Sequence, residues 1–415
     1  MRFVRLFFRF LYKILKLILK TVGILFGLLL LIFLFNYLIS ERYIFPEPHL
    51  FSGKYWYNPY AGMDSLHWQR TNLHMHSRAW GGLTNGSDNS SQEIWKIYRE
   101  LGYNSIGISN YQNINSLNAG EPWYIPVYEH GYGIFKNHQL VIGARKVLWF
   151  DLPFGQNIHQ KQYILNRLRK TTDLISINHP AFFGGYPPSD FKFLTGYDLL
   201  EVLNGYSNSI PHWDTALSNG KPAFLMADDD MHEISNAREA SRRLTEINAP
   251  DNKQQSIFAA LRAGCAYGVE IKMPKKETYR GKARRLDSLP NVRSVTVRGD
   301  SLNIALDKPG TEFRFMGQNG KLLYKQANTC SATYILQPGD TYVRTVILFS
   351  TAQQQEGILY YFNPVLRTSD GKRPLMAEAV LDTRSTLVKR IIGFSSVIFV
   401  LLNIILLRRR FRRRK

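Results

Sequence analysis

A chain of 415 residues with 45% hydrophobic content is long enough for one large domain and a smaller one, each with its own core. Its formal net charge of +21 invites comparison with nucleic-acid-binding proteins, but sixteen of the 53 Lys and Arg residues lie in the first twenty positions and from Arg384 onward, where no Asp or Glu opposes them. Much of the charge therefore belongs to the two ends of the chain, and we expect no nucleic-acid partner.

The basic start of the chain leads into twenty residues without a charge, from Thr21 to Ser40. This is the length of a membrane-spanning helix. The bulky residues that end the run differ from the small residues of a signal-peptide cleavage site, so the span is expected to remain attached. We assign residues 1–41 to a basic cytoplasmic segment and a transmembrane helix. Residues 42–67, rich in aromatic residues and prolines, form a predicted connector near the membrane surface.

Residues 68–271 alternate short apolar runs with amphipathic stretches. Helical spacing is found at 91–101, 160–170, 214–219 and 254–263, and strand-like runs at 104–109, 139–147, 174–178, 199–203 and 223–227. Strands and helices that alternate in this way predict parallel βα units. In a parallel barrel, the carboxyl ends of distant strands meet at one mouth.

Candidate metal ligands accompany three of the predicted strands. His74 and His76 alternate within 71–77, so on a strand they would project from the same face and could reach one ion. His179 follows the run 174–178, and Asp230 and His232 follow the run 223–227. An isolated His-x-His pair is common on protein surfaces, but three strand ends with such residues together predict a metal centre.

After residue 271, the alternation of strand-like and helical segments ends. A run of lysines and arginines within 272–289 is interpreted either as a solvated linker or as a contact for anionic lipid headgroups or an anionic substrate. Residues 290–382 contain short strand-like segments separated by Gly, Pro, Asp and Asn, which predicts a small antiparallel β-sandwich. Cys265 and Cys330 fall in different predicted domains, so a disulfide between them is allowed but not expected.

A second apolar run of seventeen residues, Ile391 to Leu407, precedes a tail of arginines and a final lysine. Flanking arginines can extend toward the headgroups, so this run is sufficient for a span. We assign 383–415 to a second transmembrane helix with a basic cytoplasmic tail. Because positive loops stay in the cytoplasm, both termini are expected there. The protein is then expected in the inner (cytoplasmic) membrane, with its main domains periplasmic or otherwise extracytoplasmic.

The region from about 68 to 270 resembles the PHP (polymerase and histidinol phosphatase) family of metal-dependent phosphoesterases. Segments 71–77 and 101–111 resemble the first two motifs of that family, and 177–180 and 230–232 resemble its later ligand motifs. Segment 141–145 stands where the family has Gly-x-Glu. The resemblance implies a distorted (β/α)7 barrel of the PHP type, with its site at the carboxyl ends of the strands.

Two motifs depart from the family pattern. The second motif, which usually ends in Asp-His, reads Asn110-Tyr111, and Arg145 stands in the place of the Glu that bridges two ions in the family. A cation at that place would repel a neighbouring ion. The metal site therefore looks degenerate.

The resemblance then implies a site for one divalent ion, zinc or manganese. His74, His76 and Asp230 would hold it, with a water completing the shell. His179 and His232 match ligand motifs of the other ion positions, which now lack partners.

Two functional interpretations remain open. In the first, the protein is a metal-dependent phosphoesterase that acts on a phosphorylated envelope or lipid-derived substrate. Arg145 would then grip the phosphate, and Asp228 or Asp229 would act as a base or orient a ligand. The retained ligand residues favour this hydrolase.

In the second interpretation, the barrel is catalytically inactive, a pseudoenzyme that serves as a binding or accessory subunit of a membrane protein complex. Arg145 would then pair with Asp228, Asp229 or Glu201 inside the barrel. The lost ligands favour this accessory role, and metal bound at the barrel mouth would argue against it.

Overall fold

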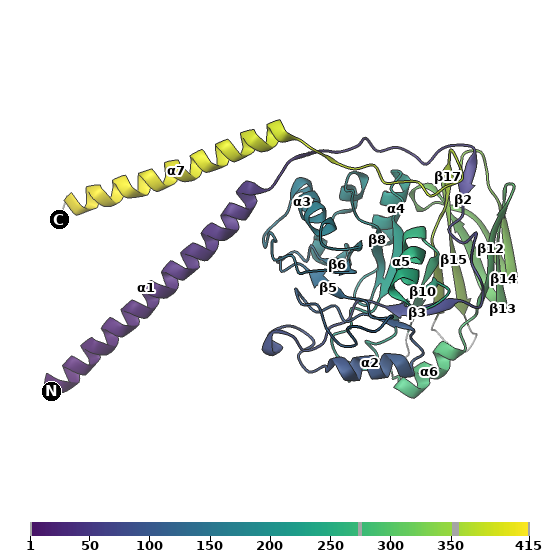
Figure 1. The fold of residues 1–415 in the computed structure, drawn as a ribbon, viewed down its shortest axis with the longest axis horizontal. Coiled ribbons are helices and arrows are strands. Elements are labelled where there is room, and N and C mark those ends of the chain that lie inside the picture. Colours follow the sequence, from purple (N-terminus) through teal and green to yellow (C-terminus); the bar gives the residue numbers. More distant parts are fainter. Residues whose placement is uncertain (1, 273–275, 351–356, 414–415) are drawn as a thin grey trace.

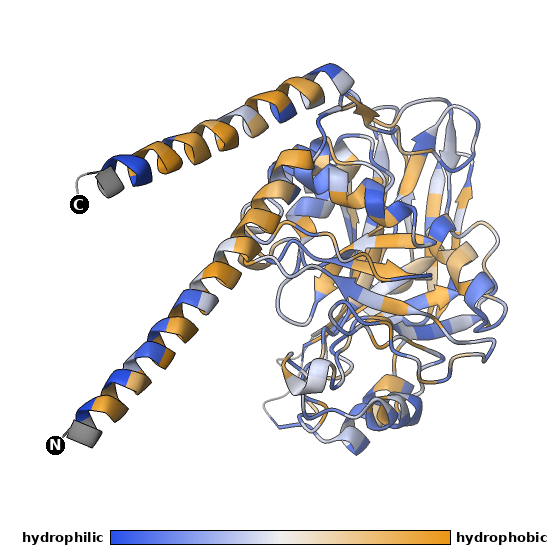
Figure 2. Ribbon diagram, turned by 60° about the vertical axis from the view of Figure 1, so that its left-hand side comes forward, coloured by the Kyte–Doolittle hydropathy of each residue, from blue (hydrophilic) through white to orange (hydrophobic). Residues whose placement is uncertain are grey.

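The computed structural model describes residues 2–272, 276–350 and 357–413 (Figure 1). Two long helices, α1 (Arg2–Ile39) and α7 (Thr383–Arg413), leave the folded part on the same side, and both ends of the chain point away from it. Each helix is long and apolar enough to cross a membrane, and Figure 2 shows hydrophilic residues along the N-terminal half of α1 and toward both ends of α7. A short antiparallel pair, β1 (Tyr43–Ile44) and β18 (Val380–Leu381), joins the segments next to the two helices.

Five strands form one sheet in the order β5 (Val127–His130), β6 (Gln139–Ile142), β7 (Leu174–Ile177), β8 (Leu199–Asn204) and β9 (Phe224–Asp228). Strands β7, β8 and β9 are parallel, and α4 (Ile210–Ser218) connects β8 to β9, as α3 (Ile158–Arg169) precedes β7. Every residue of these strands is buried. This is the pattern of strands covered on both faces.

The other large sheet has eleven strands. Its main path runs β12 (Val292–Arg298), β13 (Ser301–Met316), β15 (Tyr342–Ser350), β16 (Gly357–Phe362), β11 (Ala266–Ile271), β10 (Arg243–Asn248), β3 (Trp68–Asn72) and β4 (Ser105–Ile106). Strand β14 (Leu322–Ile335) pairs with β13, and β17 (Val365–Thr368) pairs with β15 and β2 (Tyr55–Tyr57). Helices α2 (Ser91–Glu100), α5 (Gln254–Ala263) and α6 (Tyr279–Asp287) complete the fold. The protein is thus a mixed α/β structure.

The expected distorted (β/α)7 barrel is not shown, because the described part of the chain forms no closed barrel. Strand β6 is antiparallel to both of its neighbours, and β10 is antiparallel to β3 and β11. Strand β11 uses its outer edge to pair with β16, so the sheet continues into the C-terminal strands instead of closing. The two sheets still pack closely, because a Cβ on Gly268 of β11 would lie 2.5 Å from Leu225 of β9.

The predicted helices and most predicted strands between 91 and 263 are confirmed, and the C-terminal strands are antiparallel as expected. Those strands belong to the same sheet as β10 and β11. Helix α6 lies within the predicted basic linker, where Lys282 is buried and forms an ion pair with Glu277 at 3.2 Å. The solvated-linker interpretation therefore fails at Lys282. Cys265 is buried, Cys330 is exposed, and both are free thiols.

A buried ion pair links the regions predicted as barrel and sandwich. The guanidinium of Arg344 in β15 donates to both carboxylate oxygens of Asp214 in α4, at 2.8 and 2.9 Å, and lies 5.1 Å from the ring centroid of Trp213. The Arg344 side chain is only 3% exposed. Removal of its partner would therefore leave a charge buried without compensation.

We predict that Asp214→Ala destabilises the protein by about 3–5 kcal/mol, since breaking a buried pair costs far more than breaking an exposed one. Thermal unfolding followed by tryptophan fluorescence should show a melting temperature lower by roughly 10 °C. Lys253→Gln, which removes an exposed pair with Asp251, is the matched control and should melt like the wild type. Equal melting temperatures for the two variants would contradict this role of Asp214.

Candidate metal centre

Four buried side chains from three parts of the chain bring their donor atoms together. His74 and His76 follow β3, Glu129 belongs to β5, and Asp230 follows β9. Nε2 of each histidine lies 3.2 Å from Oδ1 of Asp230 and 3.3 Å from a carboxylate oxygen of Glu129. Ligands around a tetrahedral zinc ion at about 2.0–2.1 Å would be roughly 3.3–3.4 Å apart. The spacing therefore fits one shared cation.

A second group of donors uses the same carboxylate. Oε1 of Glu129 lies 2.8 Å from Nδ1 of His138 and 3.1 Å from Nε2 of His179. His138 directly precedes β6 and His179 follows β7, and both side chains are buried. Glu129 is therefore common to two groups that could each hold a metal ion.

The unpaired polar atoms of the site test whether an ion fits. Nε2 of His74, both ring nitrogens of His76, Oε2 of Glu129 and Oδ1 of Asp230 are buried without a hydrogen-bond partner. Buried polar atoms are normally hydrogen-bonded, so this many orphans at one point calls for a ligand. Imidazole nitrogens and carboxylate oxygens suit zinc and manganese, and the residues thus fit a divalent cation.

The two carboxylates of the first donor group, Glu129 and Asp230, carry negative charge that would attract a cation. Burial alone would raise the pKa of this carboxyl, but the facing His138 and His74 hold its pKa well below the usual range. Burial likewise opposes the ionised form of Asp230, and the surrounding histidines outweigh burial and lower its pKa. Both carboxylates are therefore anionic in a buried place.

Glu201 of β8 contacts His74, a member of the first donor group, on the ring nitrogen that faces away from that group. Its Oε1 lies 2.8 Å from Nδ1 of His74, and its Oε2 accepts hydrogen bonds from the backbone N–H of His179 and from Asn204 at 2.7 and 3.1 Å. A carboxylate on the far nitrogen of a metal-ligating histidine fixes the ring and its tautomer. Glu201 can therefore leave Nε2 of His74 free for a cation.

The loops after β7 and β9 each hold one residue in a strained backbone conformation. His179 has φ +27° and Asp230 has φ +52°, values that residues other than glycine rarely adopt. The Asp230 N–H donates to the carbonyl of His74 at 2.8 Å, and the His76 N–H donates to the carbonyl of Met231 at 2.9 Å. Such strain collects at functional sites, where it fixes a side chain that would otherwise turn away.

The two aspartates before Asp230 anchor the backbone around the site. Asp229 accepts five hydrogen bonds, of which those from Tyr98, Asn72 and Ser241 measure 2.7, 2.8 and 2.6 Å. The other two come from the N–H groups of residues 242 and 243. Asp229 belongs to neither donor group, and both of its oxygens are taken up by these five contacts.

Asp228 accepts the N–H of Leu73 at 2.7 Å and so joins β9 to β3. Burial, together with the nearby Glu201, raises the pKa of Asp228 to about 8. A protonated Asp228 would cost less to bury beside other carboxylates.

His232 lies beside the two donor groups and belongs to neither. Its ring stacks on His76 with centroids 4.4 Å apart, and its nitrogens contact the hydroxyls of Tyr206 and Tyr111 at 3.1 and 3.3 Å. Burial and the neighbouring His76 lower its pKa to about 4. Oδ1 of Asn110 accepts hydrogen bonds from the backbone N–H and the hydroxyl of Ser77, so it serves the loop structure.

The structure does not bring Arg145 to this cluster, contrary to both interpretations of the sequence. Strand β6 ends at Ile142, Gly143 turns the chain with φ +72°, and the Arg145 side chain emerges 55% exposed. Its guanidinium pairs with Asp173 at 3.3 Å. Glu129, and not residue 145, is the carboxylate that the two donor groups share.

Sequence reasoning missed Glu129 and His138 and gave Glu201 only a structural role. Glu129 lies in a short strand, Val-Tyr-Glu-His, between Pro126 and Gly131. The only signal for Glu129 in the sequence was an acidic residue in a short apolar segment that ends at a glycine turn.

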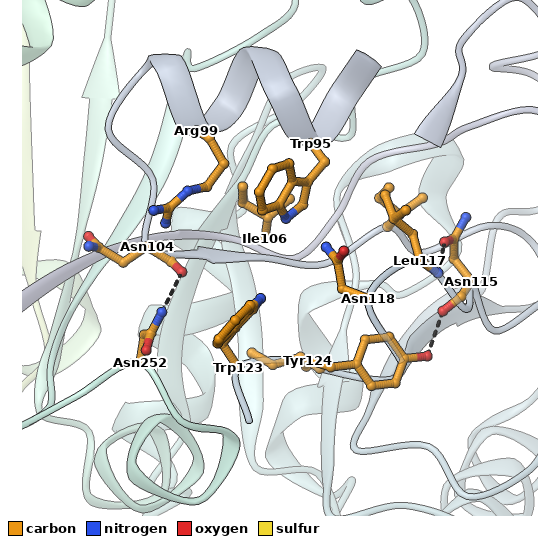
Figure 3. A pocket seen from close by; sticks show the side chains of 12 residues that line it. Trp95, Arg99, Asn104, Ile106, Asn115, Leu117, Asn118, Trp123, Tyr124 and Asn252 are labelled. Atoms are coloured by element: carbon orange, nitrogen blue, oxygen red, sulfur yellow. Dashed lines mark hydrogen bonds between the residues drawn. The ribbon is translucent and has the colours of Figure 1, made fainter. Parts of the chain in front are cut away.

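A separate pocket of about 300 Å3 lies beside α2 (Figure 3). Trp95, Trp123 and Tyr124 line it, and Asn252 donates to the carbonyl of Asn104 at 3.3 Å across one end. None of its lining residues belongs to either donor group. We therefore assign this pocket no part in the metal chemistry.

The fold and the site thus define a mixed α/β protein with a buried His/Glu/Asp cluster suited to a metal ion. No family model matches the sequence, and no curated protein sequence matches it. A solved structure that does match is a two-domain protein from Bacteroides vulgatus ATCC 8482, described as containing a predicted PHP-like metal-dependent phosphoesterase. The two chains are 12% identical, the match covers 81% of this chain and 99% of that chain, and the TM-score is 0.36. Similarity at this level assigns neither a family nor a function.

We predict that Glu129→Gln weakens zinc or manganese binding at least about a hundredfold, because it removes the one carboxylate that both groups share. Arg145→Gln should bind metal like the wild type, since its side chain points to the surface. Isothermal titration calorimetry on both variants makes the comparison. Loss of binding in Arg145→Gln, with retention in Glu129→Gln, would contradict the geometry described above.

We predict a different result for Tyr98→Phe, which removes one of the donors to Asp229. The protein should lose about 1–2 kcal/mol of stability, since a hydrogen bond to a charged group is lost while four remain. Metal stoichiometry should stay at the wild-type value because Tyr98 touches no ligand. Elemental analysis and thermal unfolding separate the two effects, and a loss of bound metal without a loss of stability would count against a structural role for Asp229.

Proposed function

We propose that this protein is a membrane-anchored, metal-dependent phosphoesterase whose centre would hold two divalent ions, with Glu129 as a member of both donor groups. The observation that carries the proposal is the pair of buried donor groups that share this carboxylate. His74, His76 and Asp230 would complete the first position, and His138 and His179 the second. The expectation of a single ion rested on a cation at the bridging place, and Glu129 removes that objection.

Divalent ions at such a paired site activate water and neutralise the charge that develops on a phosphoryl group. The residues of this chain fix the ligands and their surroundings. Glu201 holds the ring of His74, and the strained backbone at Asp230 keeps its carboxylate turned into the cluster. Tyr111 and Tyr206 present hydroxyls next to His232, where they can donate hydrogen bonds to an oxygen of a bound phosphoester.

The interpretation as an inactive accessory subunit rested on the lost ligands. It also expected Arg145 to pair with Asp228, Asp229 or Glu201 inside the barrel. Arg145 instead pairs with Asp173 at the surface, and the cluster keeps its unpaired donors. Asn110 and Tyr111 belong to neither donor group, so the departure at the second motif takes no member from either group.

The proposal includes a location. Helices α1 and α7 would each cross the inner membrane, with the basic ends in the cytoplasm, because positively charged flanks stay on that side. The centre would then face the extracytoplasmic space and act there on a phosphorylated envelope or lipid-derived substrate.

We predict that the purified full-length protein, loaded with manganese or zinc, binds about two equivalents of metal. It should hydrolyse bis(p-nitrophenyl) phosphate or p-nitrophenyl phosphate, and a chelator should abolish this activity. His138→Ala should retain about one equivalent, because only the second group loses a ligand. Elemental analysis and absorbance of released nitrophenolate provide the measurements.

Arg145→Gln, with two equivalents of metal and wild-type turnover, is the matched control. A metal-loaded wild-type protein that cleaves neither ester nor any panel of phosphomonoesters and phosphodiesters would refute the hydrolase. Failure to bind metal at all would refute the centre itself.

A further inference from the structure

Exposed apolar side chains lie on the loops that carry the candidate ligands and on the neighbouring segment 149–154. Trp80 follows His76 by four residues, and Phe183 follows His179 by four. Ile134 and Phe135 lie on the loop that joins Glu129 to His138. We call the following six exposed residues the apolar rim: Trp80, Ile134, Phe135, Trp149, Phe154 and Phe183.

The rim is held together by contacts between its loops. The indole of Trp80 meets that of Trp149 with centroids 5.6 Å apart. The N–H of Ile134 donates to the carbonyl of Pro153 at 2.9 Å, and the N–H of Tyr132 donates to the carboxylate of Asp151 at 2.8 Å. The loops 131–137 and 149–154 are therefore one connected surface. Soluble proteins rarely expose several large apolar side chains side by side without a partner.

The rim continues onto α1, which indicates what covers it. Phe154 contacts Phe33 and Tyr37 with ring centroids 6.2 and 6.4 Å apart, and its N–H donates to the Tyr37 hydroxyl at 2.8 Å. Asn36 donates to the carbonyl of Asp151 at 3.3 Å. Phe33 lies six residues before the end of α1, or about 9 Å along a helix that rises 1.5 Å per residue. Phe154 thus packs against the apolar part of α1, before the C-terminal end of the helix.

The orientation of the folded part agrees with this contact. In Figure 1, β5 and β6 lie on the side from which α1 and α7 leave. Exposed tryptophan and phenylalanine side chains beside the C-terminal end of α1 suit the boundary between lipid headgroups and acyl chains.

We propose that the apolar rim rests in the membrane interface and turns the metal centre toward the bilayer, so that, if the centre is a phosphoesterase as proposed above, its substrate is a phosphorylated amphiphile drawn from the lipid. The phosphoester head of such a substrate would reach the candidate metal ligands at the strand ends. Its apolar tail would remain against the apolar rim. A soluble phosphoester would lack the second contact.

Contact with lipid is tested on the full-length protein in phosphatidylcholine liposomes. In a Cys330→Ser background, Ile134→Cys and, separately, Phe183→Cys carry an environment-sensitive fluorophore, and lipids with a nitroxide high on the acyl chain act as quencher. Ile335→Cys, equally apolar and exposed but on β14 at the opposite side of the fold, is the matched control. We expect nitroxide lipids to remove roughly half of the fluorescence at 134 and 183 and little at 335, as for residues inside and outside the interface.

Equal quenching at all three positions, or none at 134 and 183, would overturn the membrane contact. This outcome does not depend on catalysis, so it separates the surface from the proposed function.

The substrate class is tested with two probes that carry the same phosphomonoester. The metal-loaded protein in liposomes is given phosphatidic acid in the bilayer or glycerol 3-phosphate in solution, and phosphate release is measured. We expect the lipid to be preferred by at least about tenfold in kcat/KM, because only it contacts the rim. Equal or reversed preference would overturn the amphiphile class, and cleavage of neither probe would count against it and leave the quenching result as it stands.

Discussion

The site depends on one electrostatic constraint, a carboxylate buried among imidazoles. Glu129 has no exposed surface and touches histidines from three segments of the chain. A buried carboxylate is tolerated only where positive charge balances it, supplied by protons on the imidazoles or by a metal ion. Desolvation works against a proton on His74, yet the carboxylates of Asp230, Glu201 and Glu129 raise its pKa well above the usual range. Metal binding would release such protons, because ligating imidazoles are neutral.

The rest of the fold places the ligands around Glu129. Sheet β5–β9 supplies Glu129, His138, His179 and Asp230 at or next to strand ends, and β3 of the other sheet supplies His74 and His76. The two sheets are joined at this point by backbone hydrogen bonds between the segments at His74 and Asp230, and by the hydrogen bonds that Asp229 accepts from Asn72 of β3 and Arg243 of β10. Closure into a barrel is unnecessary for this task. Two packed sheets can bring distant strand ends to one place as long as their edges are fixed to each other.

Local sequence signals pointed to four members of the two donor groups and to many of the elements. His74 and His76 alternate on a segment that continues a strand, and His179 and Asp230 follow buried apolar runs, so residue spacing alone singled out side chains that the structure brings together. Glu129, the acid common to both donor groups, could not be found in this way, because a family spacing pointed to Arg145 while the chain turns outward at Gly143. Strand pairing was equally inaccessible. The reversed direction of β6 and the pairing of β11 with β16 depend on contacts far apart in sequence, which short-range periodicity does not encode.

The same contacts that order the ligands also fix the height of the centre relative to α1. Glu129 and His138 lie at the two ends of the loop 131–137, the backbone of this loop is bonded to 151–153, and residues 151–154 are bonded to Asn36 and Tyr37 of α1. A shift of the folded part along the helix would break these bonds and move two candidate ligands at once. The rim, two candidate ligands and α1 are therefore linked through one series of hydrogen bonds. A helix that served only to tether the protein would need no such connection, since a flexible linker after Ser40 would suffice.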